Sequence, residues 1–94
     1  MAEIKVQRLN DTQFRVEVRE GTSPTIHTVT ATPEDLQRYG AGVSPETLPE
    51  TLIEQSFKFL LERESKESIL PSFTLSVIEQ YFPDYPKVIH SRLG

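Results

Sequence analysis

The sequence contains no cysteine. It therefore has no disulfide, no thiol nucleophile and no thiolate ligand for zinc. Glycine is also scarce, with four residues, and neither a G-x-G-x-x-G nor a G-K-[ST] phosphate-binding loop occurs. A G-x-S-x-G nucleophile motif is missing as well. These absences remove the common sequence signatures of redox, nucleotide-dependent and serine-hydrolase chemistry, and we expect a protein that is not an enzyme and binds no cofactor.

Long apolar runs are lacking too. No stretch approaches the ~20 residues that a membrane-spanning helix needs, and the N-terminal MAEIKVQR has no apolar core of the kind found in signal peptides. The absence of cysteine suits a reducing compartment. The sequence therefore predicts a soluble, cytoplasmic protein without a membrane partner.

Basic residues are too few for an obvious polyanion-binding protein. Ten Lys and Arg stand against 14 Asp and Glu, which gives a formal net charge of −4. Nucleic-acid binding needs clustered positive charge, so nucleic acid is an unfavourable main partner. The acidic excess falls within residues 32–67, where a solvated helix surface accounts for it.

Ninety-four residues correspond to one domain, spanning 1–94. Within it, residues 3–31 show the period-two alternation of strands with one buried face, most cleanly at Phe14, Val16 and Val18. Asn10-Asp11-Thr12 predicts a tight turn between the first two strands. We therefore expect an antiparallel β-meander over 3–31.

The third strand of this meander, TIHTVTA over 25–31, is rich in β-branched residues but alternates poorly. Ile26 and Val29 fall on opposite faces. Either the strand contains a bulge, or one of these two side chains is exposed.

Residues 47–64, TLPETLIEQSFKFLLERE, predict the helix that organises the core. Thr47 and Glu50 have capping-box spacing, and Pro49 lies in the first turn, where its missing N–H costs little. The apolar arc covers roughly 200° of the helix surface, about twice the stripe that one packing partner requires; it comprises Leu52, Ile53, Ser56, Phe57, Phe59, Leu60 and Leu61. We expect the sheet on one flank and a C-terminal helix on the other.

Two further helical segments are expected in residues 32–90. Thr32 is a favourable N-cap before Pro33, and Gly40 a suitable left-handed stop. Near the C-terminus, residues 72–82 predict a helix that Pro83 ends, with one more turn over 84–89 and a frayed tail at 91–94. The fold class is therefore α+β: a three-stranded antiparallel meander followed by three helices packed on one sheet face.

The segments SFKFLLERES and ILPSFTLSVIEQYFPDYPKVI carry a resemblance to a small family of uncharacterised bacterial proteins. The resemblance covers residues 52–89, and its specific part is Ile78 with Tyr81-Phe82-Pro83 and Tyr85. It implies a bacterial, cytoplasmic origin and transfers no functional residue.

The two histidines, His27 and His90, lie far apart in the sequence. A metal site would have to bring them together with a carboxylate, and we expect each to be an exposed or hydrogen-bonded residue instead. No metal is expected.

The remaining functional candidates are surfaces. The wide arc of the central helix and the aromatic tail predict contact with a protein partner or a second copy of the chain, with a role in the core as the alternative for each residue; the candidates are Leu52, Phe59, Leu61, Tyr81, Phe82 and Tyr85. A weaker nucleic-acid candidate is the wet face of the first hairpin with Lys5, Arg15 and Arg19, which an ordinary mixed-charge surface also explains. The sequence thus favours an interaction module over a nucleic-acid-associated regulatory factor.

Overall fold

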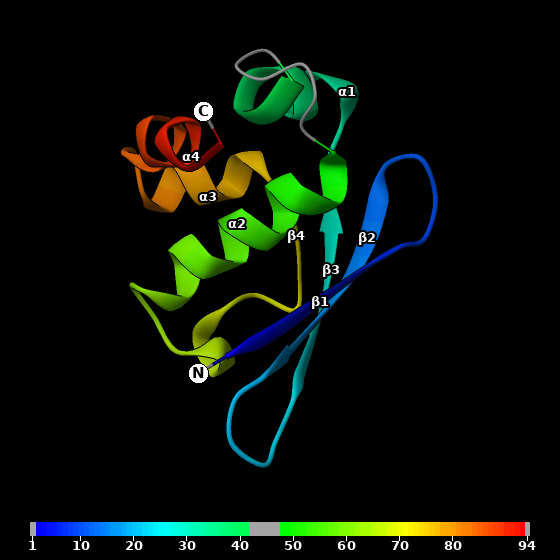
Figure 1. Cartoon of the computed structure of the whole chain (residues 1–94), viewed down its shortest axis with the longest axis vertical. Helices are drawn as coiled ribbons and strands as arrows, with labels where there is room; N and C mark the ends of the chain where they lie inside the picture. Colours follow the sequence, from blue (N-terminus) through cyan, green and yellow to red (C-terminus); the bar gives the residue numbers. More distant parts are fainter. Residues whose placement is uncertain (1, 42–47, 94) are drawn as a thin grey trace.

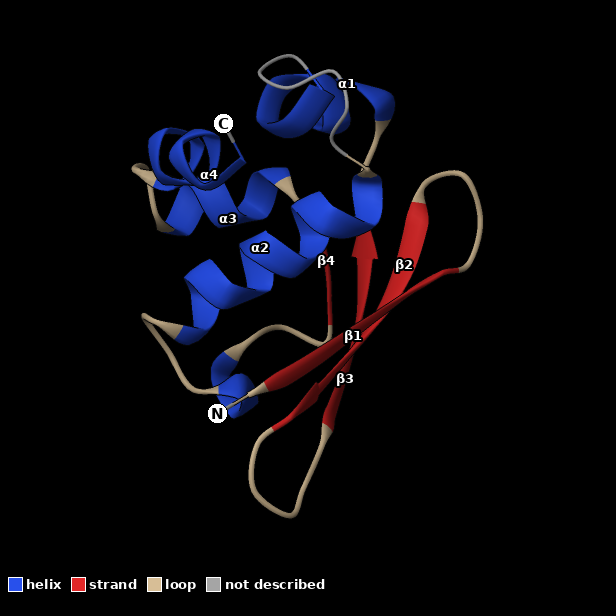
Figure 2. Ribbon diagram, viewed as in Figure 1, coloured by secondary structure: helices blue, strands red, loops and turns tan. Residues whose placement is uncertain are grey.

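A four-stranded mixed sheet forms one layer of the molecule. The computed structural model describes residues 2–41 and 48–93. The strands are β1 (Glu3–Arg8), β2 (Gln13–Arg19), β3 (Thr25–Thr30) and β4 (Ser72–Thr74), in the order β1-β2-β3-β4. The first three pair antiparallel, as the sequence predicts, and β4 adds to β3 in parallel (Figure 2).

The helices form the second layer, on one side of the sheet (Figure 1). They are α1 (Pro33–Leu36), the π-helix η1 (Gln37–Ala41), α2 (Pro49–Leu61), the 3-10 turn η2 (Lys66–Ser68), α3 (Ser76–Tyr81) and α4 (Tyr85–Leu93). The predicted α+β class is therefore confirmed, whereas the predicted numbers of three strands and three helices are wrong. Among the described residues, no helix has the length and apolar character needed to cross a bilayer.

The inner sheet face follows the alternation in the sequence. Phe14, Val16 and Val18 of β2 are fully buried under the helices. The turn before β2 is an Asx turn: the Asn10 side-chain oxygen accepts hydrogen bonds from the backbone N–H groups of Thr12 and Gln13, at 3.0 and 2.9 Å. This bonding closes the hairpin without a positive φ angle at a non-glycine residue in the described chain.

Strand β3 resolves the conflict between Ile26 and Val29 by exposing one of them. Val29 is buried beside Phe14, whereas Ile26 lies on the outer face and is exposed. His27 shares the inner face with Val29. Its Nδ1 lies 2.8 Å from the Leu70 carbonyl oxygen, and its Nε2 lies 2.9 Å from Thr25 Oγ1. The imidazole therefore ties the segment before β4 to the sheet.

Strand β4 corrects the predicted helix over 72–82, since only Ser76–Tyr81 is helical in that stretch. Phe73 pairs with Val29 and faces the core. The pairing is bounded by hydrogen bonds from Thr28 N to Pro71 O (2.8 Å) and from Leu75 N to Thr30 O (3.0 Å). Three residues are too few to show a period of two, so Phe73 also fitted the helical spacing that continues into α3.

The chain after β3 starts a helix at the predicted place. Thr32 and Asp35 form a reciprocal capping box, and Pro33 occupies the first turn. The predicted stop at Gly40 is wrong, because the helix continues as η1 through Gly40 to Ala41. The sequence Ser44-Pro45-Glu46 also favours an extra turn before the next helix, and these residues lie outside the described ones.

Helix α2 is sandwiched as its wide apolar arc predicts. Six of the seven arc residues are buried, and Leu61 is partly buried. One flank packs on β1 and the other on α4, so the second partner is α4 rather than the predicted 72–82 helix. Leu48 occupies the N-cap without a side-chain hydrogen bond, and Thr47 of the expected capping box lies outside the described residues.

Helix α4 extends the single turn expected at 84–89 to nine residues. Three of the four residues of the tail expected to fray are helical, and Leu93 packs partly against the core. At the start of this helix, Tyr85 is fully buried, and its hydroxyl lies 2.7 Å from Ser56 Oγ on α2. A buried polar pair that satisfies both hydroxyls fixes how α4 docks.

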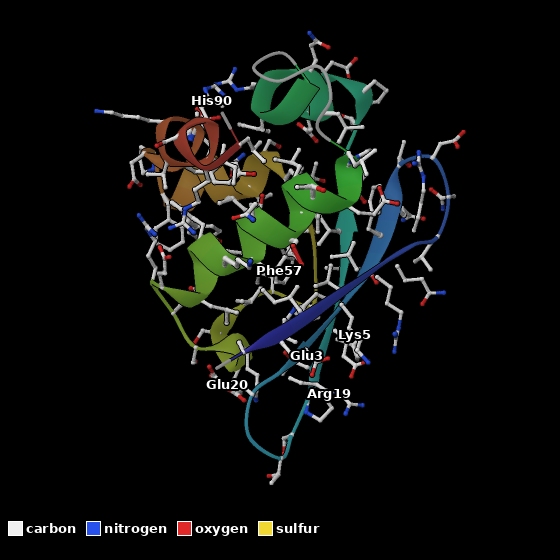
Figure 3. The ribbon with its side chains drawn as sticks, in the orientation of Figure 1. Glu3, Lys5, Arg19, Glu20, Phe57 and His90 are labelled. Carbon is white, nitrogen blue, oxygen red and sulfur yellow. The ribbon has the colours of Figure 1, made fainter. Side chains whose placement is uncertain are left out.

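The interface between α2 and the sheet can be tested at Phe57, which lies between the helix and β-strands (Figure 3). Its ring is fully buried, with centroids 5.4 Å from His27 and 6.0 Å from Phe73. We expect Phe57→Ala to reduce the free energy of unfolding by ~3–5 kcal/mol because it leaves a cavity. Urea unfolding followed by circular dichroism measures this, and a loss below ~1 kcal/mol would contradict the packing described.

Candidate functional site

An apolar groove opens between the end of α2 and helix α3, and we call it the α3 groove. Its volume is about 360 Å³, at the lower end of the ~300–1,000 Å³ typical of ligand pockets. Four segments supply its walls: the end of α2, the chain from η2 to β4, β4 itself and α3. The lining residues are Leu60, Glu64, Ser68, Ile69, Leu70, Phe73, Val77, Ile78, Tyr81 and Phe82.

The rims of the α3 groove are unusually exposed for apolar side chains. Tyr81 at the end of α3 is 68% exposed, and Leu70 before β4 is 43% exposed. Both line the groove, so the apolar surface continues from its floor onto the outside of the molecule. Exposed aromatic and aliphatic residues around a concavity are typical of protein contact sites.

One carboxylate lies in this apolar lining. Glu64 follows the last turn of α2, and partial burial raises the pKa of its carboxyl above the ordinary value. None of the ion pairs or side-chain hydrogen bonds in the described part of the chain includes Glu64. The groove therefore combines apolar walls with a single acidic group.

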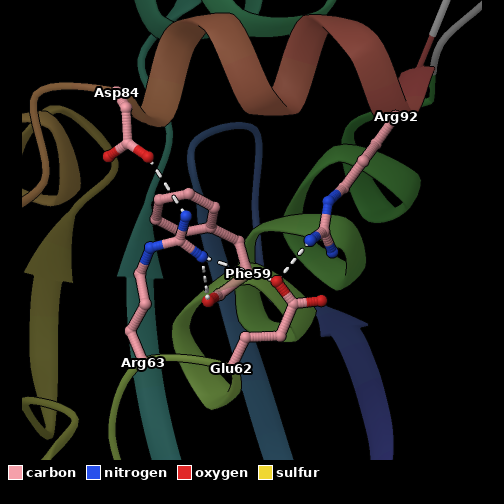
Figure 4. A network of polar contacts seen from close by, with 5 residues as sticks. All are labelled: Phe59, Glu62, Arg63, Asp84 and Arg92. Carbon is pink, nitrogen blue, oxygen red and sulfur yellow. Dashed lines mark hydrogen bonds and ion pairs between the residues drawn. The ribbon is translucent and has the colours of Figure 1, made fainter.

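The neighbouring charged residues are occupied elsewhere, as Figure 4 shows. The Arg63 guanidinium lies 3.6 Å from the centre of the Phe59 ring and donates to Asp84 at 3.1 Å. Glu62 pairs with Arg92 of α4. These contacts fasten α4 onto the end of α2. They are structural contacts, and none of them includes Glu64.

The predicted protein contacts divide into two groups. Leu52, Phe59 and Tyr85 are buried within the chain, so none of these three is available to a partner. Phe59 is covered by Arg63 and by the rings of Phe82 and Tyr85, at centroid distances of 5.8 and 5.3 Å for the two rings. The wide arc of α2 is thus satisfied within the molecule.

The other three predicted contacts stay near the surface. Tyr81 and Phe82 line the α3 groove, and Leu61 is partly buried against the core. The aromatic tail therefore serves both of the roles that the sequence left open: Tyr85 belongs to the core, and Tyr81 to the surface.

The three predicted nucleic-acid contacts, Lys5, Arg15 and Arg19, share one sheet face by strand register, opposite to the face buried under the helices. Figure 3 labels two of them, Lys5 and Arg19. Lys5 pairs in register with Glu17, Gln7 with Arg15, and Glu3 with Arg19. Glu17 forms an ion pair with Arg19, and the hydrogen bond from Arg19, with the charges of Lys5 and Arg15, lowers the pKa of the Glu17 carboxyl. The positive charges of Lys5, Arg15 and Arg19 are thus partly offset by the carboxylate of Glu17.

A second, more polar hollow lies between α1, η1 and α3. Glu79 accepts a hydrogen bond from the Tyr39 hydroxyl at 2.6 Å and pairs with Arg38 at 2.8 Å. The hydrogen bond from Tyr39 lowers the pKa of Glu79, and burial raises the pKa of Tyr39 to about 12. Both shifts move the groups away from neutral pH, where a general acid or base works best.

The chain matches no protein-family model, and it matches neither a curated protein nor a solved structure. The resemblance of residues 52–89 to small bacterial proteins stays a prediction. The geometry of the described residues therefore carries the functional argument alone.

Both histidines take part in structural hydrogen bonds. His27 is held by Leu70 and Thr25, and His90 Nε2 lies 2.9 Å from the Arg38 carbonyl oxygen. Within the described ranges, 2–41 and 48–93, no group of three or more His, Cys, Asp or Glu side chains is arranged to hold a metal ion.

Sequence reasoning missed Glu64, Ile69 and Leu70 as groove residues. Glu64 belongs to the acidic excess of residues 32–67, which a solvated helix surface explains, and the local pattern of Ile69-Leu70 before Pro71 fits an apolar pair that returns to the core. Ile69 does reach the core, whereas Leu70 is exposed. The sequence signal for the groove was the apolar pair Ile69-Leu70 directly before Pro71. This pair indicates a groove only once the pairing of β4 with β3 is known, because that pairing brings the loop beside α3.

The two glutamates at the end of α2 should respond oppositely to pH. Folding raises the pKa of Glu64, so its stabilising contribution is present below the ordinary value of 4.5 and is lost as the pH rises through its folded pKa. Folding lowers the pKa of Glu62 through its hydrogen bond with Arg92, so its contribution is present above 4.5 and is lost as the pH falls through its folded pKa.

We therefore expect Glu64→Gln to keep or slightly raise the melting temperature at neutral pH, and Glu62→Gln to lower it. In acid, below both folded pKa values, the difference between the two variants should shrink. Thermal unfolding from acidic to neutral pH measures this, and equal losses in both variants at neutral pH would contradict the assignment.

Proposed function

We propose that this protein is a non-enzymatic interaction module that receives a segment of a protein partner in the α3 groove. The observation that carries the proposal is the exposure of two large apolar side chains, Tyr81 and Leu70, in the lining of an apolar hollow. Peptide-binding domains use such grooves for apolar anchor side chains. A bacterial, cytoplasmic setting is part of the proposal and rests on the sequence resemblance and on the absence of cysteine.

The absence of a poised acid–base pair in the described residues supports a binding role over catalysis. The two hollows contain four groups with shifted pKa values, namely Glu64, Glu79, Tyr39 and Arg38. Glu79 and Tyr39 are bonded to each other, and Glu64 stands by itself in an apolar lining. A catalytic carboxylate pair would need two titratable groups converging on one enclosed site.

The alternative function is nucleic-acid binding through the open sheet face. The observation in its favour is that Lys5, Arg15 and Arg19 share that face. The Glu17 carboxylate among them opposes it, because it offsets the field that would attract phosphate. On the described strands β1, β2 and β3, this face also carries no aromatic side chain for base stacking, since Phe14 lies in the core.

The groove proposal can be tested by selecting short random peptides on the immobilised wild-type protein. Peptides selected in this way should lose at least about tenfold in affinity for Tyr81→Ser or Leu70→Ser, because one apolar anchor contact is typically worth ~1–3 kcal/mol. Fluorescence anisotropy with labelled peptides measures the affinities.

A matched control is Leu9→Ser in the β1–β2 turn, where the leucine is 48% exposed and lies outside the groove lining. This variant should bind the selected peptides as the wild type does. Failure to select any peptide, or equal binding by the groove variants, would count against the proposed function.

For the open sheet face, we expect no detectable binding of single-stranded RNA or duplex DNA at about 50 mM salt, where electrostatic binding is strong. Anisotropy of labelled oligonucleotides measures this. Binding that weakens steeply with salt and is lost in Lys5→Gln/Arg15→Gln would instead establish the alternative function.

A further inference from the structure

The negative charge in the α3 groove indicates which chemical groups a partner would need. Glu64 is the one charged residue among the ten that line the groove. It is partly withdrawn from water, and within the described chain it has no cationic partner. Partial burial without a cationic partner disfavours the charged form of a carboxylate, and an incoming cation would favour that form.

The neighbouring cations do not supply this partner. Arg63 is held between the Phe59 ring and Asp84. Lys66 is buried, with 4% of its surface exposed, and its ammonium is paired with Glu67. The two basic residues closest to Glu64 in the sequence are therefore engaged with other acids of the chain.

The same groove offers two exposed apolar rims beside Glu64. We infer that the occupant is a peptide segment of a partner protein in which an apolar anchor stands next to a lysine or arginine, the anchor filling the groove between Tyr81 and Leu70 and the cation pairing with Glu64. This inference rests on the proposed function and specifies the partner that the groove selects.

Charge complementarity also separates this occupant from others. Phosphate groups of a nucleic acid or an anionic membrane surface would meet a carboxylate in the groove and a chain of net charge −4. A second copy would have to offer an apolar residue beside a cation. Arg8 at the end of β1 and Leu9 at the start of the β1–β2 turn are such a pair, and both are exposed. The experiment must therefore distinguish self-association from binding of a partner protein.

The experiment uses an array of short peptides that each carry a Leu-x-x-Phe anchor, since apolar residues one helical turn apart are a common docking pattern. Each flanking position is occupied in turn by Lys, Arg, Gln or Glu. The full chain is applied as the wild type and as Glu64→Gln, with Glu62→Gln as the matched control because Glu62 pairs with Arg92 and does not line the groove. Circular dichroism verifies that each variant is folded.

We expect peptides with Lys or Arg at one position to bind the wild type roughly tenfold more tightly than their Gln counterparts, as for a charge-assisted hydrogen bond. Glu64→Gln should abolish this preference while retaining the apolar peptides, and Glu62→Gln should leave it unchanged. Binding without a cation preference, or a preference that survives Glu64→Gln, overturns the inference and leaves the proposed function standing.

Two other outcomes are distinct. If no peptide is retained, the proposed function fails together with the inference. Sedimentation of the chain alone tests the second copy: concentration-dependent dimers that are lost in both Tyr81→Ser and Leu9→Ser would identify the groove's occupant as the β1–β2 turn of another copy, and would overturn the assignment to a partner protein.

Discussion

The docking of α2 between the sheet and α4 is the constraint on which the rest of the structure depends. Its apolar arc is too wide for one partner, so two layers must close on it. The sheet covers one flank through β1, and α4 covers the other through the buried Ser56–Tyr85 hydroxyl pair. Arg63 and Glu62 then fasten the end of α2 to Asp84 and Arg92. Because both flanks of α2 are used within the chain, the apolar hollow described above lies at the end of this helix and involves Leu60 alone among its residues.

Much of this architecture can be predicted from the sequence where the pattern is long. The alternation over Phe14, Val16 and Val18 predicts β2, and Thr32-Pro33 predicts the start of α1. Short or irregular elements are not predicted in this way. Strand β4 has three residues, and its pairing with β3 is a tertiary contact that the local sequence around Phe73 does not indicate. The π-helix at Gln37–Ala41 carries its glycine inside a helix rather than at its end.

The candidate site was predictable only in part, for the same reason. Tyr81 and Phe82 are an aromatic pair before a proline, and composition alone marks them. The sequence does not show that Tyr85 is buried while Tyr81 is exposed, because this difference depends on how α4 packs after Pro83. Glu64 becomes distinctive only because β4 carries Leu70 and Phe73 to its side. A residue whose meaning comes from a strand pairing elsewhere cannot be assigned by local spacing.

The parallel pairing of β3 with β4 has a consequence for how binding and folding are linked. Residues 31–71 must be closed into a loop before β4 can dock, and that closure has an entropic cost that grows only slowly with length. The α3 groove exists only in the closed form, because its walls come from both sides of β4. A molecule that fills it therefore binds the folded chain selectively and must raise its apparent stability by mass action. Under the proposed function, occupancy of the groove and pairing of β4 with β3 are coupled equilibria.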